Sequence, residues 1–498
     1  MNGRIGFGLV VACATAFLLY LTTTLWNDRK PVLNRIMYHF TNTINLPRWA
    51  DDSNNGSMFP SLNQQQRPRP VIIPALPPHQ LGRQFDLLVW TARQTSEGTT
   101  LVAVTECLTG VNQVLLRDNI SNQAVAFQTK QCGGHCPGFK CKQGCWYLKS
   151  PTPLSDQPDF IRQFIPPPMA KENEIATPQN GAKLRLSVCV APMLYYVDWQ
   201  NLIEFVEMWA QQGMTTLYLY WSSMGREVQA VTDIYIDAGL VLLYPFPDLP
   251  DGKDAEILMY GQYITYSDCI LLIHQRKDDW TAFVDLDEIV TLRNHRNGSY
   301  TFADWLGTVR PPQGIVRIYD IYAYPEQWKH RSEQRVSEFN FDDFCNVPIE
   351  TGTHMTKNVA SLKIVDAGTA FWVHVRKAKG KRSMGAKKVP FGSWCPLVQR
   401  ANAQWKQRLE KRKDIQSATW PLHVFEVFNA IDPCIHRGYR VRTGCWAIRV
   451  CTKHVNGTKD FHIVKANSTR WVGLDVRQMT TISTATTKKS MSQAPQKP

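Results

Sequence analysis

Residues 184–221 read LRLSVCVAPMLYYVDWQNLIEFVEMWAQQGMTTLYLYW, and this stretch decides the fold. It opens with an apolar run typical of a buried strand and closes with a second such run, TLYLYW. Between the two runs, Asp198 is placed to cap a helix and Gly213 is placed to end it. The apolar side chains at helical spacing are Leu202, Phe205, Val206 and Trp209. The stretch therefore predicts a strand–helix–strand unit.

The same alternation continues downstream. EVQAVTDIYIDAG at 227–239 predicts a second helix, and LVLLYPF at 240–246 predicts a third strand. A longer helix is expected over roughly 255–274, followed by WTAFVDLDEIV at 280–290 as one fourth strand. Strands that alternate with helices imply an α/β fold, in which a mostly parallel sheet carries helices on both faces.

Flanking segments complete the expected organisation. GIVRIYDIYAY at 314–324 is strand-like, and SLKIV and TAFWVHV are expected to form a hairpin around Asp366-Ala367-Gly368. Residues 81–180 hold short β-like runs, a cysteine cluster and prolines, which predicts a small disulfide-stapled β-rich unit with a linker. The expected catalytic domain covers 181–477. A polar tail follows at 478–498 and is expected to be disordered.

The N-terminus predicts a membrane anchor. Residues 5–26 carry no charge and are long enough to cross about 30 Å of hydrocarbon as a helix. The alternative is a cleaved signal peptide, but the run ends in TTTLW, which offers a poor cleavage site. Residues 1–4 would be a short cytoplasmic tail, and the proline-bearing residues 27–80 would be a stem.

Two features place the body of the chain in an oxidising lumen. N-glycosylation sequons begin at Asn55, Asn119, Asn297, Asn456 and Asn467, all after the predicted anchor. Of 13 cysteines, all but Cys13 also follow the anchor. The cluster of Cys132, Cys136, Cys141 and Cys145 favours disulfides over a zinc site, in which His135 would be an extra ligand, because it lacks paired C-x-x-C units.

The formal net charge of +14 raises the question of nucleic acid. The basic residues are dispersed, and no nucleic-acid-binding module is present in the sequence, so we expect no nucleic-acid partner. The charge is better explained as a solvated basic surface, with attraction of anionic donors or phospholipid headgroups as the alternative.

Candidate chemistry follows the fourth predicted strand. Asp285, Asp287 and Glu288 come directly after an apolar run, and parallel sheets bind ligands at the carboxyl ends of their strands. Neighbouring buried carboxylates need a compensating cation, and hard divalent ions such as Mn²⁺ or Mg²⁺ prefer oxygen ligands. The alternative is a pair of surface acids at a strand end.

These segments resemble glycosyltransferase family 92. The resemblance is carried by residues 189–220, by QYITYSDCILLIHQR at 262–276 and by WTAFVDLDE at 280–288, with a weaker match in SLKIVDAGTAFWVHV. It implies a GT-A fold, a nucleotide-sugar donor such as UDP-galactose, and Mn²⁺ at a D-x-D motif. It also implies hexose transfer to a glycoprotein acceptor, such as the core fucose of N-glycans, by a single-pass type II protein of the Golgi membrane.

Applied to this sequence, the resemblance assigns Asp285 to the donor ribose and the metal, and Asp287 to direct metal ligation. His374, near the end of a later strand, resembles a third metal ligand, and the alternative is a structural histidine. Glu288 is expected to support the site from outside the ligand set, because it would point away from Asp287 on an extended strand.

Other candidates rest on chemistry alone. Arg276 could bind the donor diphosphate through a forked contact, or it could pair with Asp278 or Asp279. For an inverting reaction, Asp320 and Glu326 are the candidates for the base that deprotonates the acceptor. The two cysteines of the matching stretch, Cys189 and Cys269, are expected to be packed or disulfide-bonded instead of acting as nucleophiles.

Two other classes of function compete with a transferase. A non-catalytic lumenal glycan-binding protein could keep the sheet and dispense with the metal. A glycoside hydrolase needs two carboxyl groups that flank the scissile bond at a defined separation, and adjacent acids at one strand end do not supply that arrangement. Release of a nucleoside diphosphate would separate a transferase from both.

Overall fold

The structure is a computed structural model. It describes residues 81–106, 111–117, 123–132, 141–165, 184–250, 256–257, 261–276, 278–292, 300–308, 315–323, 333–340, 342, 345, 349–350, 356–360, 365–375, 395–422, 427, 462–466 and 472–479. All of the described helices and strands belong to one compact unit.

A mixed sheet forms the centre of the α/β part. Four parallel strands lie side by side in the order β10 (Trp280–Val284), β6 (Leu186–Met193), β7 (Met214–Trp221) and β9 (Val241–Pro245). Beyond β10 the order continues with β15 (Thr356–Ala360), β12 (Ile315–Ala323), β16 (Val365–Val375) and β11 (Glu288–Leu292), with β14 (Ile349–Glu350) paired to β12. Of these further pairs only β12 and β16 are parallel, so the predicted α/β class is confirmed while the sheet is mixed instead of mostly parallel.

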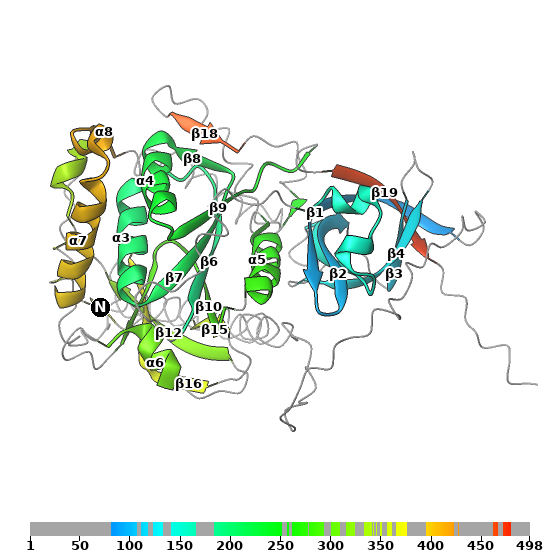
Figure 1. Cartoon of the computed structure of the whole chain (residues 1–498), viewed down its shortest axis with the longest axis horizontal. Coiled ribbons are helices and arrows are strands. Elements are labelled where there is room, and N and C mark those ends of the chain that lie inside the picture. The colour runs from blue at the N-terminus through cyan, green and yellow to red at the C-terminus, as the bar shows by residue number, and fades with distance from the viewer. Residues whose placement is uncertain are drawn as a thin grey trace, which may run out of the picture. The chain divides into compact units, whose positions relative to one another are not determined.

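Helices cover the two faces of this sheet (Figure 1). On one side lie α3 (Trp199–Gln211), α4 (Arg226–Asp237) and α7 (Cys395–Leu409), and on the other α5 (Gln262–Arg276) packs on β6. The caps predicted for α3 are present: the Asp198 side chain accepts a hydrogen bond from the Asn201 amide at 2.9 Å, and Gly213 takes φ +89°. Shorter helices are α6 (Phe302–Thr308) and α8 (Lys413–Gln416).

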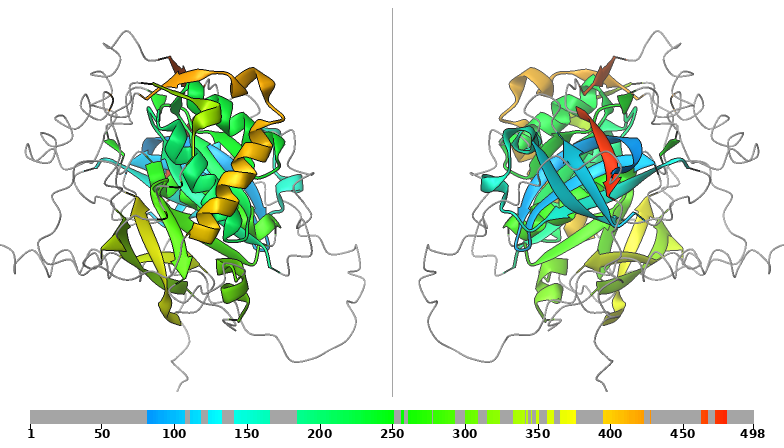
Figure 2. Two further views of the ribbon diagram at one scale, coloured as in Figure 1. Left: turned by 90° about the vertical axis from the view of Figure 1, so that its left-hand side faces the viewer. Right: turned by 90° about the vertical axis from the view of Figure 1, so that its right-hand side faces the viewer.

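The β-rich unit predicted at 81–180 is a closed barrel. Its strands are β1 (Leu81–Thr95), β2 (Gly98–Glu106), β3 (Gln113–Arg117), β4 (Ala124–Gln131), β5 (Gln143–Ser150) and β19 (Val472–Met479). The red strand β19 lies among the blue and teal strands (Figure 2), where it pairs with β1 and β3. The predicted boundary at 477 is therefore wrong, because 472–477 belongs to the barrel and the strand continues through Gln478 and Met479.

Two other sequence-based expectations differ from the structure. The helix expected from 255 begins at Gln262, after Gly261 with φ +81°. The hairpin expected at Asp366–Gly368 does not form, because these residues lie inside β16, where the register against β12 shifts after Arg317. Asp366 pairs with Arg317 of β12, and this pairing takes the place of the turn that Asp-Ala-Gly favours locally.

The barrel and the α/β part share a buried ion pair. On β1, the Arg93 guanidinium donates from Nε to the Asp268 carboxylate of α5 at 3.0 Å, and from Nη2 at 3.2 Å. The Tyr220 hydroxyl of β7 donates to the same carboxylate at 2.9 Å. Buried charges are tolerated when they are paired and hydrogen-bonded, as here, so β1 and α5 are held together by specific contacts and not by apolar packing alone.

The prediction of disulfides is confirmed for the cysteines in the described part of the chain. Cys189 is bonded to Cys269, and Cys345 is bonded to Cys395. The described members of the cysteine cluster, Cys132, Cys141 and Cys145, are disulfide-bonded as well.

No helix among the described residues is long and apolar enough to cross a membrane. The predicted anchor at 5–26, the stem at 27–80 and the sequon asparagines lie outside the described part of the chain.

Candidate active site

Three carboxylates meet at the carboxyl end of β10. The strand ends at Val284, residues 285–287 form a turn, and β11 starts at Glu288. The turn is closed by the Glu288 amide, which donates to the Asp285 carbonyl at 3.0 Å. One carboxylate oxygen from each of Asp285, Asp287 and Glu288 lies within 4.8 Å of the others, with the aspartates half-buried and Glu288 buried.

The expectation for Glu288 is corrected by this turn. The segment 280–290 is not one extended strand, so the alternation that would point Glu288 away from Asp287 does not apply. Its carboxylate folds back, and Oε2 accepts a hydrogen bond from the Asp285 amide at 2.9 Å. Glu288 is therefore a member of the acidic cluster.

Two side chains of helix α3 donate hydrogen bonds to the backbone at the acidic turn. Asn201, which is buried, donates from Nδ2 to the Leu286 carbonyl at 2.9 Å. Trp209, two turns further along the helix, donates from Nε1 to the Glu288 carbonyl at 3.0 Å. These two contacts hold the middle of the turn and the residue that follows it, so the protein itself fixes the backbone that carries the carboxylates.

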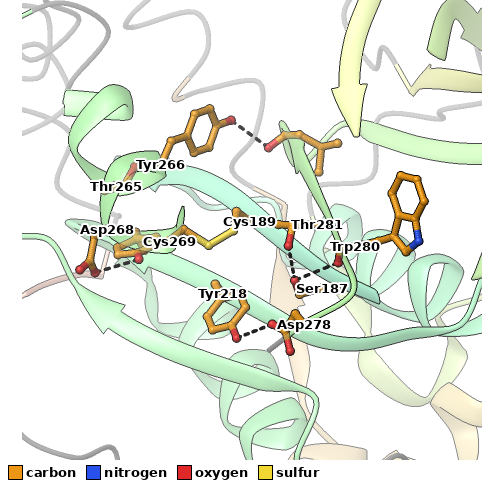
Figure 3. Close-up of a disulfide and its surroundings, with 12 residues drawn as sticks. Ser187, Cys189, Tyr218, Thr265, Tyr266, Asp268, Cys269, Asp278, Trp280 and Thr281 are labelled. Atoms are coloured by element: carbon orange, nitrogen blue, oxygen red, sulfur yellow. Dashed lines mark hydrogen bonds between the residues drawn. A yellow bond between two sulfur atoms is a disulfide. The ribbon is translucent and has the colours of Figure 1, made fainter. Parts of the chain in front are cut away.

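Helix α5 supports the same turn from its N-terminal end. Gln262 donates from Nε2 to the Tyr266 hydroxyl at 2.9 Å and approaches Asp285 Oδ1 at 3.5 Å, while the Tyr266 hydroxyl donates to the Val284 carbonyl at 3.4 Å. Figure 3 shows Tyr266 on the helix that the Cys189–Cys269 disulfide fastens to β6.

Tyr196 lies in the loop that follows β6, at the same edge of the sheet. Its hydroxyl accepts a hydrogen bond from Asn201 Nδ2 at 2.8 Å. Burial raises the pKa of Tyr196 well above its ordinary value, and the nearby charges of Asp198 and Asp287 raise it further. The group is therefore a neutral hydroxyl, able to donate a hydrogen bond close to Asp287.

The other predicted site residues differ in how close the structure places them to the acidic cluster. His374 pairs with Glu288 across β11 and β16, so the strand register brings its backbone beside the acidic cluster. Asp320 pairs with Trp372 within β12 and β16, and Glu326 lies outside the described residues.

Arg276 is not brought to the site. It ends α5 before β10 begins, whereas Asp285 follows the opposite end of that five-residue strand, a distance of about 15 Å along the strand. Its charge acts on Asp278, since Arg276 lowers the pKa of that carboxyl against the larger effect of burial, which raises it. The position fits the alternative in which Arg276 interacts with Asp278.

Residues of the site that were not identified from sequence include Asn201, Tyr196 and Gln262. Asn201 sits three positions after the helix cap, and Tyr196 and Gln262 flank strand and helix ends. None carries a motif, because a single neutral polar side chain near a helix start is common in any protein. A systematic check of polar residues next to the carboxyl ends of the predicted strands would have included Tyr196.

The residues present fit a divalent cation. Clustered carboxylate oxygens are hard ligands that suit Mn²⁺, Mg²⁺ or Ca²⁺, and the cluster contains no thiolate that would favour a softer ion. Three neighbouring negative charges, one of them on a fully buried side chain, also call for a compensating positive charge.

Comparisons with known proteins concern mainly the α/β part of the chain. No curated protein matches the chain. Among solved structures, the crystal structure of HddC from Yersinia pseudotuberculosis is similar over 45% of this chain and 100% of that chain, with 10% identity and a TM-score of 0.17. Residues 185–384, which include the acidic turn and strands β6 to β16, match the family model of glycosyltransferase family 92, and this match supports that family for the α/β part of the chain.

Proposed function

We propose that this protein is a glycosyltransferase that binds a nucleotide-sugar donor at the carboxyl edge of β6, β7, β9 and β10. The observation that carries the proposal is the cluster of Asp285, Asp287 and Glu288 directly after β10, inside the segment that matches glycosyltransferase family 92. Ligands of parallel sheets bind at this edge.

A divalent metal, Mn²⁺ or Mg²⁺, is part of the proposal. Asp287 and Asp285 would hold it, with Glu288 as a third carboxylate and His374 as a candidate that the strand register places nearby. When bound, such an ion neutralises charge on the departing nucleoside diphosphate.

The chain's own contribution is a preformed site for the cation. Asn201 and Trp209 hold the backbone of the acidic turn, so donor binding need not first order it. If transfer inverts the anomeric centre, a carboxylate takes the proton of the acceptor hydroxyl. We retain Asp320 and Glu326 as the proposed bases.

The finer assignments rest on the family resemblance. We propose UDP-galactose as the donor and the core fucose of an N-glycan as the acceptor. Residues 5–26 would anchor the protein as a single-pass type II protein in the Golgi membrane, with the body in the lumen, which agrees with the disulfides of the described part.

The test is release of UDP by the purified full-length chain, given UDP-galactose, Mn²⁺ and a fucosylated N-glycan. Parallel reactions contain EDTA, or the Asp287→Ala variant in place of the unchanged protein. We expect UDP release in the first reaction and a loss of at least roughly 100-fold in the other two, because each removes charge stabilisation of the leaving group.

Each other result has a defined meaning. Activity that persists in EDTA and in Asp287→Ala would remove the metal-dependent mechanism. Absence of UDP release with every UDP-sugar tried, combined with binding of a glycan, would favour the alternative of a non-catalytic lumenal glycan-binding protein.

A further inference from the structure

Near the acidic turn, the side-chain hydrogens of Asn201 and Trp209 are already donated to other groups of the protein. The two amide hydrogens of Asn201 go to the Leu286 carbonyl and the Tyr196 hydroxyl, at 2.9 and 2.8 Å, and the Trp209 indole goes to the Glu288 carbonyl. The Tyr196 hydroxyl differs, since it accepts from Asn201 and donates to no other residue in the described part of the chain. Within the described part of the chain, the hydrogen of this hydroxyl is therefore not used.

The backbone that carries the Tyr196 side chain is held by its surroundings. The Tyr196 amide donates to the Ser223 carbonyl at 3.3 Å, and the Tyr196 carbonyl accepts from the Gly225 amide at 2.8 Å. The preceding residue, Tyr195, takes φ +49°, a left-handed conformation that a non-glycine residue keeps only when its neighbours determine it. The loop after β6 is thus built in one conformation.

The hydroxyl also lies at the acidic turn. One nitrogen of Asn201 is within hydrogen-bond distance of both the Tyr196 hydroxyl and the Leu286 carbonyl, so these two oxygens are neighbours. Leu286 is the central residue of the Asp-Leu-Asp motif, and Asp287 is close enough for its charge to act on Tyr196.

We propose that the Tyr196 hydroxyl donates a hydrogen bond to a diphosphate oxygen of the nucleotide-sugar donor, and that Asn201 is the positioning residue that aims it. This inference rests on the proposed function and deepens it. Carboxylates offer only acceptors, so an anionic oxygen held beside them gains from a hydrogen-bond donor. A neutral hydroxyl supplies that donor.

The first experiment removes the hydroxyl and keeps the ring. In the full-length chain, Tyr196→Phe is compared with Tyr218→Phe, a buried tyrosine whose hydroxyl donates to Asp278 at 2.8 Å, before the amino end of β10. We expect Tyr196→Phe to raise both the donor KM and the Kd for UDP with Mn²⁺ by roughly 10- to 100-fold. The acceptor KM and the Mn²⁺ requirement stay unchanged, and Tyr218→Phe leaves all four quantities near those of the unchanged protein.

Binding of UDP, measured by calorimetry, separates the outcomes. If Tyr196→Phe binds UDP as the unchanged protein does, the inference is wrong while the proposed function stands. Weaker binding of UDP-galactose with unchanged binding of UDP would place the contact on the sugar and overturn the diphosphate assignment. Equal losses in both variants would show a structural role only. If the unchanged protein neither binds nor releases UDP, the proposed function fails, and this inference fails with it.

A second experiment tests the role of Asn201. In Asn201→Asp, an oxygen replaces the donating nitrogen, so the Tyr196 hydroxyl turns its hydrogen towards position 201. We expect the Kd for UDP to rise at least as much as in Tyr196→Phe, because Asn201→Asp also removes the hydrogen bond to the Leu286 carbonyl. We expect no further rise when Tyr196→Phe is added to Asn201→Asp. Multiplicative effects in the double variant would contradict the coupling.

Discussion

Glu288 gives the acidic turn a third negative charge on a side chain that is fully buried (0% exposed). A buried carboxylate is costly unless it is hydrogen-bonded and its charge is compensated. The Asp285 amide supplies one hydrogen bond to it, and a cation between the three carboxylates would supply the compensation. Glu288 would thus both stabilise the turn, through the Asp285 amide, and contribute negative charge to cation binding.

Glu288→Gln tests this link, because it preserves the shape and an acceptor for the Asp285 amide but removes the charge. We expect the Mn²⁺ concentration that gives half-maximal UDP release to rise roughly 10-fold or more. The increase in Tm caused by Mn²⁺ should shrink in parallel, which provides a measurement without turnover.

The control for this substitution is Glu338→Gln, which removes the same charge from a side chain that is 62% exposed. Mn²⁺ dependence should be unchanged there. A Glu288→Gln protein with the metal requirement of the unchanged chain would place Glu288 outside the ligand set, as the sequence alone suggested.

At the scale of elements, α3, α4 and α7 meet at one buried carboxylate. Glu207 of α3 accepts from Arg408 Nε of α7 at 3.0 Å, and Tyr235 of α4 lies close enough to lower the pKa of the same carboxyl. Burial raises the pKa of Glu207 to about 7, while Arg408 and Tyr235 each lower it by smaller amounts. The packing of these three helices therefore depends on pH near neutrality.

The direction in which the free energy of unfolding changes with pH follows from proton binding by Glu207. Between its ordinary pKa of 4.5 and about 7, Glu207 holds a proton in the folded protein but not in the unfolded chain. Its contribution to stability is therefore complete below about pH 4.5 and is lost as the pH rises towards 7. We expect this part of the free energy of unfolding to fall by at most about 3 kcal/mol over that interval.

Urea denaturation of the unchanged protein and of Glu207→Gln between pH 5 and 8 measures this contribution. The difference between the two free energies of unfolding should change steadily from pH 5 to 7 and level off above it, since other titrating groups cancel in the comparison. A difference that does not vary with pH would contradict the raised pKa of Glu207.

The helices and strands also show which parts of the fold can be predicted from the sequence. The positions of β6, α3, β7, α4 and β9 follow from local periodicity and caps, and the structure confirms them. The break between β10 and β11 was missed, because WTAFVDLDEIV is apolar enough for one strand and only the hydrogen bonds of Asp285 and Glu288 reveal the turn. The sequence places Asp285, Asp287 and Glu288 at a strand end, and the structure clusters them there, whereas the orientation of Glu288 required the fold.

At the scale of the whole molecule, the barrel is built from two distant parts of the chain. Without β19, both β1 and β3 would expose unpaired backbone groups along an edge, and such edges promote aggregation. No periodicity within 81–180 reveals that a strand at 472–479 completes this unit, because pairing between remote segments leaves no local signal.

Truncation tests the importance of this strand. A chain that ends after Trp471 lacks β19, and we expect it to lose most of its soluble yield and its UDP release, since β1 also carries Arg93 to α5. A chain that ends after Thr480 keeps every barrel strand and should resemble the full-length protein in both measurements. Equal solubility and Tm of the two truncated chains would show that the barrel is stable without β19.

The position of β19 also sets the timing of folding during synthesis. Roughly 320 residues separate the end of β5 from the start of β19. At typical rates of translation, the ribosome needs roughly 15 to 65 s to make them. For that interval the barrel strands already synthesised have an open edge, and the α/β part emerges while the barrel is incomplete. The nascent chain is therefore expected to need chaperone protection at β1 and β3 until β19 has been synthesised.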